Sequence, residues 1–268
     1  RTWPRFVDLV ILAAVFAGLY GLSRVAAEFA SPLVPAAAIS RRPSALPAYT
    51  AYSLFRIGAA YLLSLAFSLV YGYAAAYSAR AERIMIPLLD ILQSIPVLSF
   101  LPGVMLALVG LFPARQLGLE LGAILLIFTG QAWNMTFSFY SSLKSIPGEL
   151  RDAATVCGFS WWQRLWQLEL PYAAIGLIWN SMMSVAGGWF FLMACEMFVL
   201  GRRDFRLPGL GSYLQAAASA GDTQAIVCGI AAMVIAVAAV DSIVWRPLAA
   251  WADKFKFEEV DGAPARPP

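Results

Sequence analysis

Long stretches without charged residues are the feature that most constrains how this chain can fold. Six apolar segments can be drawn, over Phe6–Val25, Leu54–Tyr77, Ile95–Phe112, Leu121–Leu143, Tyr172–Leu200 and Gln224–Leu248. Roughly twenty residues of helix are enough to cross about 30 Å of hydrocarbon. The segments lack the alternation of barrel strands, and in lipid a helix satisfies its own backbone hydrogen bonds. We therefore predict an all-α membrane protein with about six transmembrane helices.

The composition supports this class and argues against others. Apolar residues make up 60% and charged residues 13% of the chain, against about 45–50% and about 25% in soluble domains. The chain has no histidine, so the commonest general base and metal ligand are missing. Its three cysteines, Cys157, Cys195 and Cys228, form no metal-binding pattern. We therefore expect no catalytic residue, no metal and no bound cofactor. The net charge is only +3 and the basic residues are scattered between the spans, so we expect no nucleic-acid partner either.

The lysines and arginines predict how the chain is oriented. With the N-terminus inside, eleven of them lie on the cytoplasmic side and seven on the outer side. The positive-inside rule favours this topology. It places both termini and the polar segment 145–171 in the cytoplasm.

Two places interrupt the simple pattern of spans. Pro96 and Pro102 fall in the third span, which we expect to be kinked or to begin with a separate short helix. The loop between the fifth and sixth spans, residues 201–222, mixes glycines with apolar residues. We expect this loop to dip back against the bundle.

The first part of the 145–171 segment has the pattern of a short capped helix. Glu149 and Asp152 place negative charge near the helix N-terminus, where the helix dipole favours it. Ala153 and Ala154 have high helix propensity and little bulk. Gly158 suits a left-handed C-terminal cap. The small side chains leave one side of this helix nearly bare.

A second short helix is predicted directly after the first. Ser160 and Gln163 form an S-x-x-Q capping box. Trp161, Trp162 and Trp166 follow, and tryptophan is typical of a bilayer interface. Such a helix pair indicates a docking element at the membrane surface. The alternative is a solvated loop that only joins two spans, although joining needs only a few residues.

The same segment carries a motif. The letters D-A-A, three residues, G, nine residues and L-E-L-P, from Asp152 to Pro171, resemble the EAA loop of permease subunits of binding-protein-dependent ABC importers. The likeness runs from about Leu54 to Trp251, and "LLDILQSIPVLSFLP" and "PGLGSYLQAA" resemble the nitrate, sulfonate, taurine and bicarbonate branch. Asp152 stands where the motif has glutamate, and Leu168 where it has isoleucine. The resemblance implies the type I importer permease (MetI-like) fold.

The resemblance also implies partners. The segment would form the coupling helix that is seated in a groove of a cytoplasmic ATPase subunit. The residues that would couple the two proteins are Glu149, Asp152, Ala153, Ala154, Gly158, Leu170 and Pro171. The chain has no phosphate-loop motif, so ATP and Mg²⁺ would be bound by that partner and the chain would not be an enzyme. A second permease half, identical or similar, and an external solute-binding protein would complete an assembly in the bacterial cytoplasmic membrane.

The predicted chain has three parts. Residues 1–50 would hold a transmembrane helix and an external segment, and residues 51–250 the permease core. Residues 251–268 would be a cytoplasmic tail or a linker to a second permease half.

Polar residues inside the spans are the candidates for a solute pathway. They are Gln131, Asn134, Ser138, Asn180, Ser184 and Glu196. Such residues either line a path or join helices through small-residue packing and hydrogen bonds. Glu196 could instead pair with an arginine of the following loop, and Arg56 is expected near a membrane interface.

Together these features predict an ATP-driven importer permease for a small anion such as nitrate, a sulfonate or taurine, or bicarbonate. The alternative is an ion-coupled secondary transporter or channel that works without an ATPase. That class should show ionisable pairs near the middle of the membrane and inverted repeats. The sequence shows no such repeat.

Overall fold

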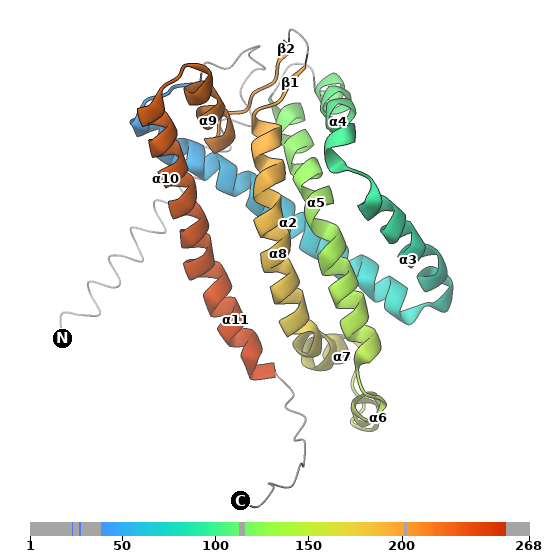
Figure 1. The fold of residues 1–268 in the computed structure, drawn as a ribbon. Coiled ribbons are helices and arrows are strands. Elements are labelled where there is room, and N and C mark those ends of the chain that lie inside the picture. The colour runs from blue at the N-terminus through green and yellow to red at the C-terminus, as the bar shows by residue number, and fades with distance from the viewer. Residues whose placement is uncertain (1–22, 24–26, 28–38, 113–115, 201–202, 256–268) are drawn as a thin grey trace, which may run out of the picture.

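The described part of the chain is a bundle of helices that run between two ends (Figure 1). The computed structural model describes residues 39–112, 116–200 and 203–255, together with Ser23 and Ala27. The longer helices are α2 (Leu46–Tyr77), α3 (Ala79–Ser94), α4 (Val97–Leu111), α5 (Leu117–Ser145), α8 (Leu170–Glu196) and α10 (Thr223–Val240). The shorter elements are η1 (Pro43–Ala45), α6 (Gly148–Val156), α7 (Trp161–Arg164), η2 (Leu165–Glu169), β1 (Val199–Leu200), β2 (Arg203–Asp204), α9 (Leu210–Ser219), η3 (Asp241–Trp245), α11 (Arg246–Ala252) and η4 (Asp253–Phe255). The predicted all-α class is confirmed.

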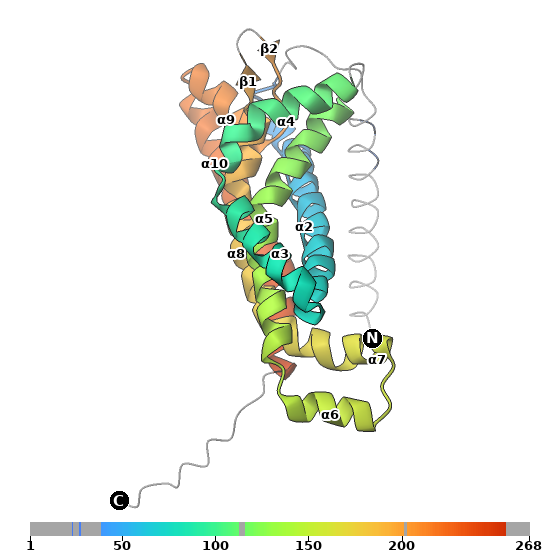
Figure 2. The same ribbon diagram turned by 90° about the vertical axis from the view of Figure 1, so that its right-hand side faces the viewer.

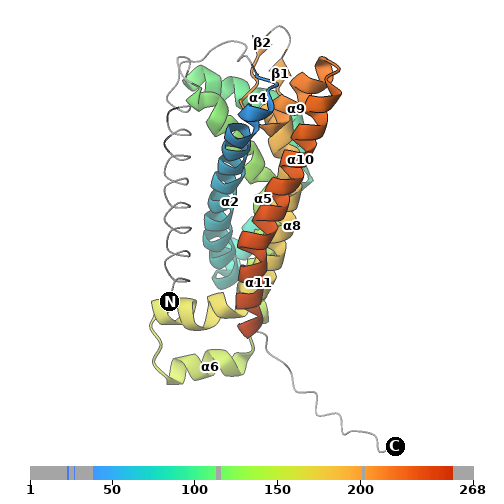
Figure 3. The ribbon, with the colours of Figure 1, turned by 90° about the vertical axis from the view of Figure 1, so that its left-hand side faces the viewer.

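Helices α2, α5 and α8 form the centre of the bundle, with α3 and α4 on one side and α10 and α11 on the other (Figures 1 and 3). Small residues let α2 approach α5 closely. The Ser68 hydroxyl lies 3.1 Å from the carbonyl of Ala132 and 2.9 Å from the Thr136 hydroxyl. A Cβ at Gly72 would lie only 2.9 Å from the Phe139 ring. Small residues at such contacts are typical of membrane helix pairs.

Three continuous helices of the described residues are long and apolar enough to cross a membrane. They are Pro43–Tyr77, Trp161–Glu196 and Thr223–Phe255. The bent pair of α3 and α4 makes a fourth if it counts as one span. Helix α5 has 29 residues, which is long enough to cross, but its polar residues keep it out of this group. The predicted first span, Phe6–Val25, lies outside the described residues apart from Ser23.

The predicted break in the third span occurs at Pro96. Ile95 is extended (φ −78°, ψ 122°), as expected before a proline, and α3 and α4 meet there at 93°. Helix α4 continues through Pro102. The break is therefore set by the first of the two prolines, and the helix before it has 16 residues.

The two ends of the bundle differ in structure (Figure 2). We call the end that carries α6 and α7 the α6 end, and the opposite end, which carries α4, α9 and the strands, the α9 end. At the α9 end β1 pairs antiparallel with β2, with Val199 opposite Asp204. The chain then folds back, since Leu207 is buried and its N–H donates to the carbonyl of Glu196 at 3.2 Å. The predicted dip against the bundle is confirmed for residues 203–222.

Candidate functional site

Helix α6 lies beyond the end of the bundle and crosses its direction (Figure 2). Its polar side is exposed, and the Val156 side chain at its last position is 87% exposed. Ala154 is buried instead. The Arg151 guanidinium donates to the carbonyl of Leu143, near the end of α5, at 2.5 Å. The helix is therefore held to α5 while one face stays free.

The turn after α6 has the predicted left-handed glycine. Gly158 has φ +68°, a conformation that side chains with a Cβ rarely adopt. The N–H of Phe159 donates to Ala154 at 3.0 Å, and the N–H of Cys157 donates to Ala153 at 2.9 Å. These bonds satisfy carbonyls that the end of a helix leaves open. The turn ends α6 sharply and starts α7 at once.

Helix α7 begins with the predicted capping box. The Ser160 hydroxyl accepts a hydrogen bond from the Gln163 N–H at 3.3 Å, and the Gln163 side chain accepts one from the Ser160 N–H at 2.9 Å. The Trp161 indole donates to the Tyr73 hydroxyl of α2 at 2.6 Å. Trp162 and Trp166 are more than half exposed. The second helix is thus attached to the bundle, with its tryptophans at the surface.

A π-helical turn, η2, joins α7 to α8 (Figure 2). Helix α7 lies across the end of the bundle, whereas α8 runs along it, so η2 is an elbow. Bends of this kind are commonly found at π-helical turns. Leu170 and Pro171, the last residues of the motif, stand directly after the elbow as the first turn of α8.

The seven residues predicted to contact an ATPase therefore fall into three groups. Glu149, Asp152, Ala153 and Gly158 are exposed at the α6 end. Ala154 faces the protein. Leu170 and Pro171 form the first turn of α8, directly after the elbow. The first group shares an exposed surface, and the others support it.

Four of the predicted pathway residues lie in the middle parts of α5 and α8, namely Gln131 and Ser138 of α5 and Asn180 and Ser184 of α8. Gln131 and Ser184 are buried, and neither side chain has a hydrogen-bond partner among the described residues. A Cβ at Gly188 would lie 2.4 Å from the Gln131 amide nitrogen. Gln131 therefore lies between α5 and α8, and Ser184 is enclosed within the bundle.

Ser138 and Asn180 both lie against Gly176 of α8. The Asn180 amide donates to the Gly176 carbonyl at 2.9 Å. A Cβ at Gly176 would lie 3.0 Å from the Ser138 hydroxyl. Ser138 of α5 therefore lies at the contact with α8, whereas the Asn180 amide is bonded within α8 itself.

Asn134 differs from the other candidates because its side chain is exposed. Its neighbours along α5 face α8, since Gln131 packs on Gly188 and the Met135 sulfur accepts a hydrogen bond from Ser181 at 3.2 Å. These contacts involve the middle parts of both helices. Asn134 therefore presents its amide on the exposed surface of α5 and α8, midway between the ends of the bundle. We call this surface the open face.

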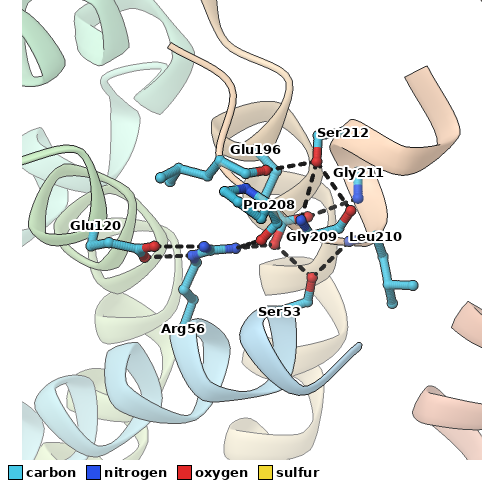
Figure 4. A network of polar contacts seen from close by, with 10 residues as sticks. Ser53, Arg56, Glu120, Glu196, Pro208, Gly209, Leu210, Gly211 and Ser212 are labelled. Atoms are coloured by element: carbon cyan, nitrogen blue, oxygen red, sulfur yellow. Dashed lines mark hydrogen bonds and ion pairs between the residues drawn. The ribbon is translucent and has the colours of Figure 1, made fainter. Parts of the chain in front are cut away.

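At the α9 end, charged residues from three helices meet (Figure 4). Arg56 of α2 donates to both carboxylate oxygens of Glu120 of α5, at 2.5 and 2.6 Å. It also donates to Glu196 of α8 at 2.8 Å and to the Pro208 carbonyl at 2.9 Å. The Ser53 hydroxyl donates to Glu196 at 2.6 Å. All three charged side chains are 0–1% exposed. We call these five residues the Arg56 network.

The start of α9 completes this network. The N–H of Gly211 donates to Glu196 at 2.7 Å, and the N–H of Leu210 donates to the Ser53 hydroxyl at 3.0 Å. Because the network has one cation and two carboxylates, these N–H groups at a helix N-terminus help to balance the excess negative charge. A Cβ at Gly209 would lie 2.3 Å from the Glu196 carboxyl group. Glycine is needed there for the chain to approach the carboxylate.

The sequence interpretation of these charges was incomplete. Glu196 does pair with an arginine, but this arginine is Arg56 of α2, which is 140 residues away in the sequence, rather than one in the loop that follows. Arg56 was expected near an interface and is fully buried. The predicted fourth span begins at Leu121, one residue after Glu120, so this carboxylate is not among the candidates from the sequence. A cation within one apolar segment and a carboxylate at the edge of another could have indicated this pairing.

This chain is similar in sequence to a protein family and to two bacterial permeases. A family described as "Binding-protein-dependent transport system inner membrane component" matches residues 68–246. The taurine transport system permease protein TauC of Escherichia coli (strain K12) is 28% identical over 187 residues, 70% of this chain and 63% of that protein. A protein of Bacillus subtilis (strain 168) named as an aliphatic sulfonates transport permease, SsuC, is 25% identical over 146 residues, 54% of this chain. The match spans 50% of SsuC, so this chain covers about half to under two-thirds of these relatives.

A solved structure has a similar fold. One chain of the MetNI methionine ABC transporter, in an inward-facing conformation, superimposes with a TM-score of 0.56 at 16% sequence identity. The match covers 76% of this chain and 94% of that one. The likeness supports the predicted MetI-like fold. Since the family match covers two-thirds of the 268 residues, the chain belongs to the binding-protein-dependent transport system inner membrane components.

Proposed function

We propose that this chain is the permease half of an ATP-driven importer, and that helix α6 couples it to a cytoplasmic ATPase. The observation that carries the proposal is the exposed, capped helix α6, which lies beyond the bundle and is linked to it through α5 and the elbow. A stiff helix with an exposed face can bind the ATPase, and its movement would then displace the helices to which it is attached. The α6 end would then face the cytoplasm.

The free energy for transport would come from ATP hydrolysis by the partner ATPase subunits. The sequence has no phosphate-loop motif, so ATP and Mg²⁺ would be bound by ATP-binding cassette subunits. ATP binding can shift the bundle only if those subunits bind its two conformations with different affinities. An exposed α6 surface is suited to such a state-dependent contact.

The solute pathway would lie on the open face of α5 and α8, closed by a second permease half. Asn134 supports this because a polar side chain facing lipid in mid-membrane is unfavourable. Met183 and Phe190 of α8 are exposed as well. Gln131, Ser138, Asn180 and Ser184 would then serve mainly in helix packing, and Glu196 in the Arg56 network. An external binding protein would deliver the solute at the α9 end.

The proposed solute is a small anion of the sulfonate type, with nitrate and bicarbonate as further candidates. Two relatives are named for taurine and for aliphatic sulfonates. Among the described residues of α5 and α8, none of the exposed side chains is acidic. An anion would therefore meet uncharged donors such as Asn134 without repulsion.

An ion-coupled carrier fits the arrangement less well. Such a carrier needs ionisable groups that exchange with solvent near the middle of the membrane. The Arg56 network does contain ionisable residues within the bundle. However, it lies at the α9 end, and its charged atoms are sealed from solvent.

The proposal is tested by placing charge or bulk on the coupling surface. Ala153→Asp adds a carboxylate to the exposed face of α6, and Gly158→Val puts a β-branched residue at a left-handed position. Each variant is co-expressed with an ATPase subunit and a binding protein. We expect normal membrane insertion, but loss of co-purified ATPase and of ATP hydrolysis stimulated by the taurine-loaded binding protein.

The matched control is Ala79→Asp, which adds the same charge to an exposed alanine at the start of α3. It should keep both activities. Normal ATPase binding and taurine import by Ala153→Asp would contradict the proposal. So would a wild-type chain that co-purifies with no ATPase.

A further inference from the structure

Glu169 stands at the elbow between α7 and α8, as the last residue of the π-helical turn η2. Its side chain is fully buried, although its neighbours Trp166 and Gln167 are exposed. A carboxylate loses its hydration on burial and needs partners in return. A buried acid within an exposed segment therefore needs a specific explanation.

The contacts of Glu169 connect the elbow to α2. Its Oε1 accepts a hydrogen bond from the hydroxyl of Tyr77, the last residue of α2, at 2.5 Å. The same oxygen lies 3.0 Å from Nε of Arg164, the last residue of α7. The Arg164 guanidinium in turn lies 5.4 Å from the centre of the Tyr77 ring. One carboxylate thus joins the end of α7 to the end of α2.

A second contact joins the beginning of α7 to the same turn of α2. The Trp161 indole donates to the Tyr73 hydroxyl at 2.6 Å, and the Tyr73 and Tyr77 rings lie 4.7 Å apart. Helix α6 is held differently, through Arg151 and the carbonyl of Leu143 in α5. The two helices of the segment are therefore attached to two different helices of the bundle.

Helix α2 leads from this contact to the Arg56 network. Tyr77 and Arg56 are 21 residues apart in one continuous helix, which corresponds to about 32 Å. Between them α2 packs closely on α5 through Ser68 and Gly72. A shift of α7 that moves Tyr77 along the helix axis would therefore be felt at the α9 end.

We propose that Glu169 is a positioning residue that fixes α7 to α2, so that movement of the ATPase reaches the bundle. The inference rests on the proposed function of the segment. Without this carboxylate α7 can turn about the elbow while α2 stays in place. ATP hydrolysis would then continue with little import.

The test compares Glu169→Gln with Tyr77→Phe. The amide keeps the size of the side chain but removes the charge that holds Arg164, and phenylalanine removes only the hydroxyl. Each variant is reconstituted with its ATPase and binding protein, and taurine import and ATP hydrolysis are measured together. We expect near-normal hydrolysis and about a tenfold fall in taurine imported per ATP hydrolysed, the size of effect that loss of a charged hydrogen bond gives.

Two comparisons make the result specific. Because both variants act on the same chain of contacts, from Arg164 through Glu169 to Tyr77, their effects should not be independent, and the double variant should fall by less than the product of the two single falls. Glu82→Gln is the matched control, since Glu82 pairs with Tyr140 and Lys144 but does not touch the 145–171 segment. It should leave import per ATP unchanged.

The outcomes separate this inference from the proposed function. A wild-type chain without ATPase-driven import would overturn both. Wild-type import together with normal import per ATP in Glu169→Gln and Tyr77→Phe would overturn only the role of Glu169. If import and hydrolysis both fall in proportion to the amount of folded protein, Glu169 contributes only to stability, and its positioning role is overturned as well. If Glu169→Gln does not fold, the comparison of taurine import per ATP between Tyr77→Phe and Glu82→Gln decides whether the contact matters.

Discussion

Both ends of the bundle contain buried carboxylates, but these carboxylates differ in how completely they are hydrogen-bonded. At the α9 end, each carboxylate oxygen of Glu120 and Glu196 accepts a hydrogen bond from a buried or backbone donor. At the α6 end, Glu169 has one bonded oxygen, and its Oε2 is buried without a partner. Nε of Arg151 is also buried without one. The carboxylates of the Arg56 network are thus fully bonded, whereas the Glu169 carboxylate is not. Elsewhere at the α9 end, the side-chain oxygens of Gln116 and Gln215 are buried without a partner among the described residues.

This difference indicates which end can move. Separating the helices at the α9 end would leave charges uncompensated in a place that water does not reach, which is strongly unfavourable. At the α6 end the tyrosines and tryptophans are partly exposed, so water can replace a lost contact. The unbonded Glu169 Oε2 and Arg151 Nε at this end can also form new hydrogen bonds. We infer that the α9 end keeps its structure within one chain while the α6 end rearranges.

The largest effect is expected from Arg56→Ala. The substitution removes the only cation of the Arg56 network and leaves two carboxylates without their main partner. Breaking a buried ion pair in this way costs about 3–5 kcal/mol, a large part of the about 5–15 kcal/mol that stabilises a typical protein. Chemical unfolding in detergent micelles should show this loss, together with a low yield of folded protein.

Arg246→Ala is the matched control for that experiment. Arg246 also pairs with an acid, Asp241, at 2.9 Å, but its side chain is 74% exposed. Exposed pairs contribute little, so the free energy of unfolding should hardly change. Equal losses for Arg56→Ala and Arg246→Ala would show that the network does not hold the α9 end together.

Local sequence patterns predicted the α6 end well. The positive φ of Gly158 and the capping box of Ser160 and Gln163 depend on residues within a few positions of each other. Their geometry therefore follows from propensities and short-range hydrogen bonds. The break at Pro96 was predictable for the same reason, because a proline constrains the residue before it.

The α9 end could not be predicted in this way. Arg56 is 64 residues from Glu120 and 140 from Glu196, so their meeting depends on how three helices pack. The polar stripe on α5 shows the same limit. The sequence marks Gln131, Asn134 and Ser138 alike as polar residues of one span, but only the packing decides that Gln131 is buried and Asn134 exposed. Glu169 was read only as part of a motif, since its partners lie at the end of another helix.

A smaller effect is expected from Gly209→Ala. The added Cβ would lie 2.3 Å from the Glu196 carboxyl group, so the loop or the carboxylate has to shift. Forcing extra volume into a packed site costs about 1–3 kcal/mol. The free energy of unfolding in micelles should fall by that amount. Gly58→Ala is the control, because nothing lies within 4 Å of its Cβ position in α2, and it should be neutral or slightly stabilising.

The smallest effect is expected from Ser160→Ala at the α6 end. The variant removes the hydroxyl that caps α7, a loss of about 1 kcal/mol. Because this end already rearranges, the loss should appear as faster hydrogen exchange of residues 161–169, with the unfolding of the whole bundle unchanged. Ser141→Ala, on an exposed position within α5, should leave exchange in that segment as it was. If Ser160→Ala instead lowered the stability of the whole bundle as much as Gly209→Ala does, the two ends would form one cooperative unit, and the distinction between a fixed end and a moving end would fail.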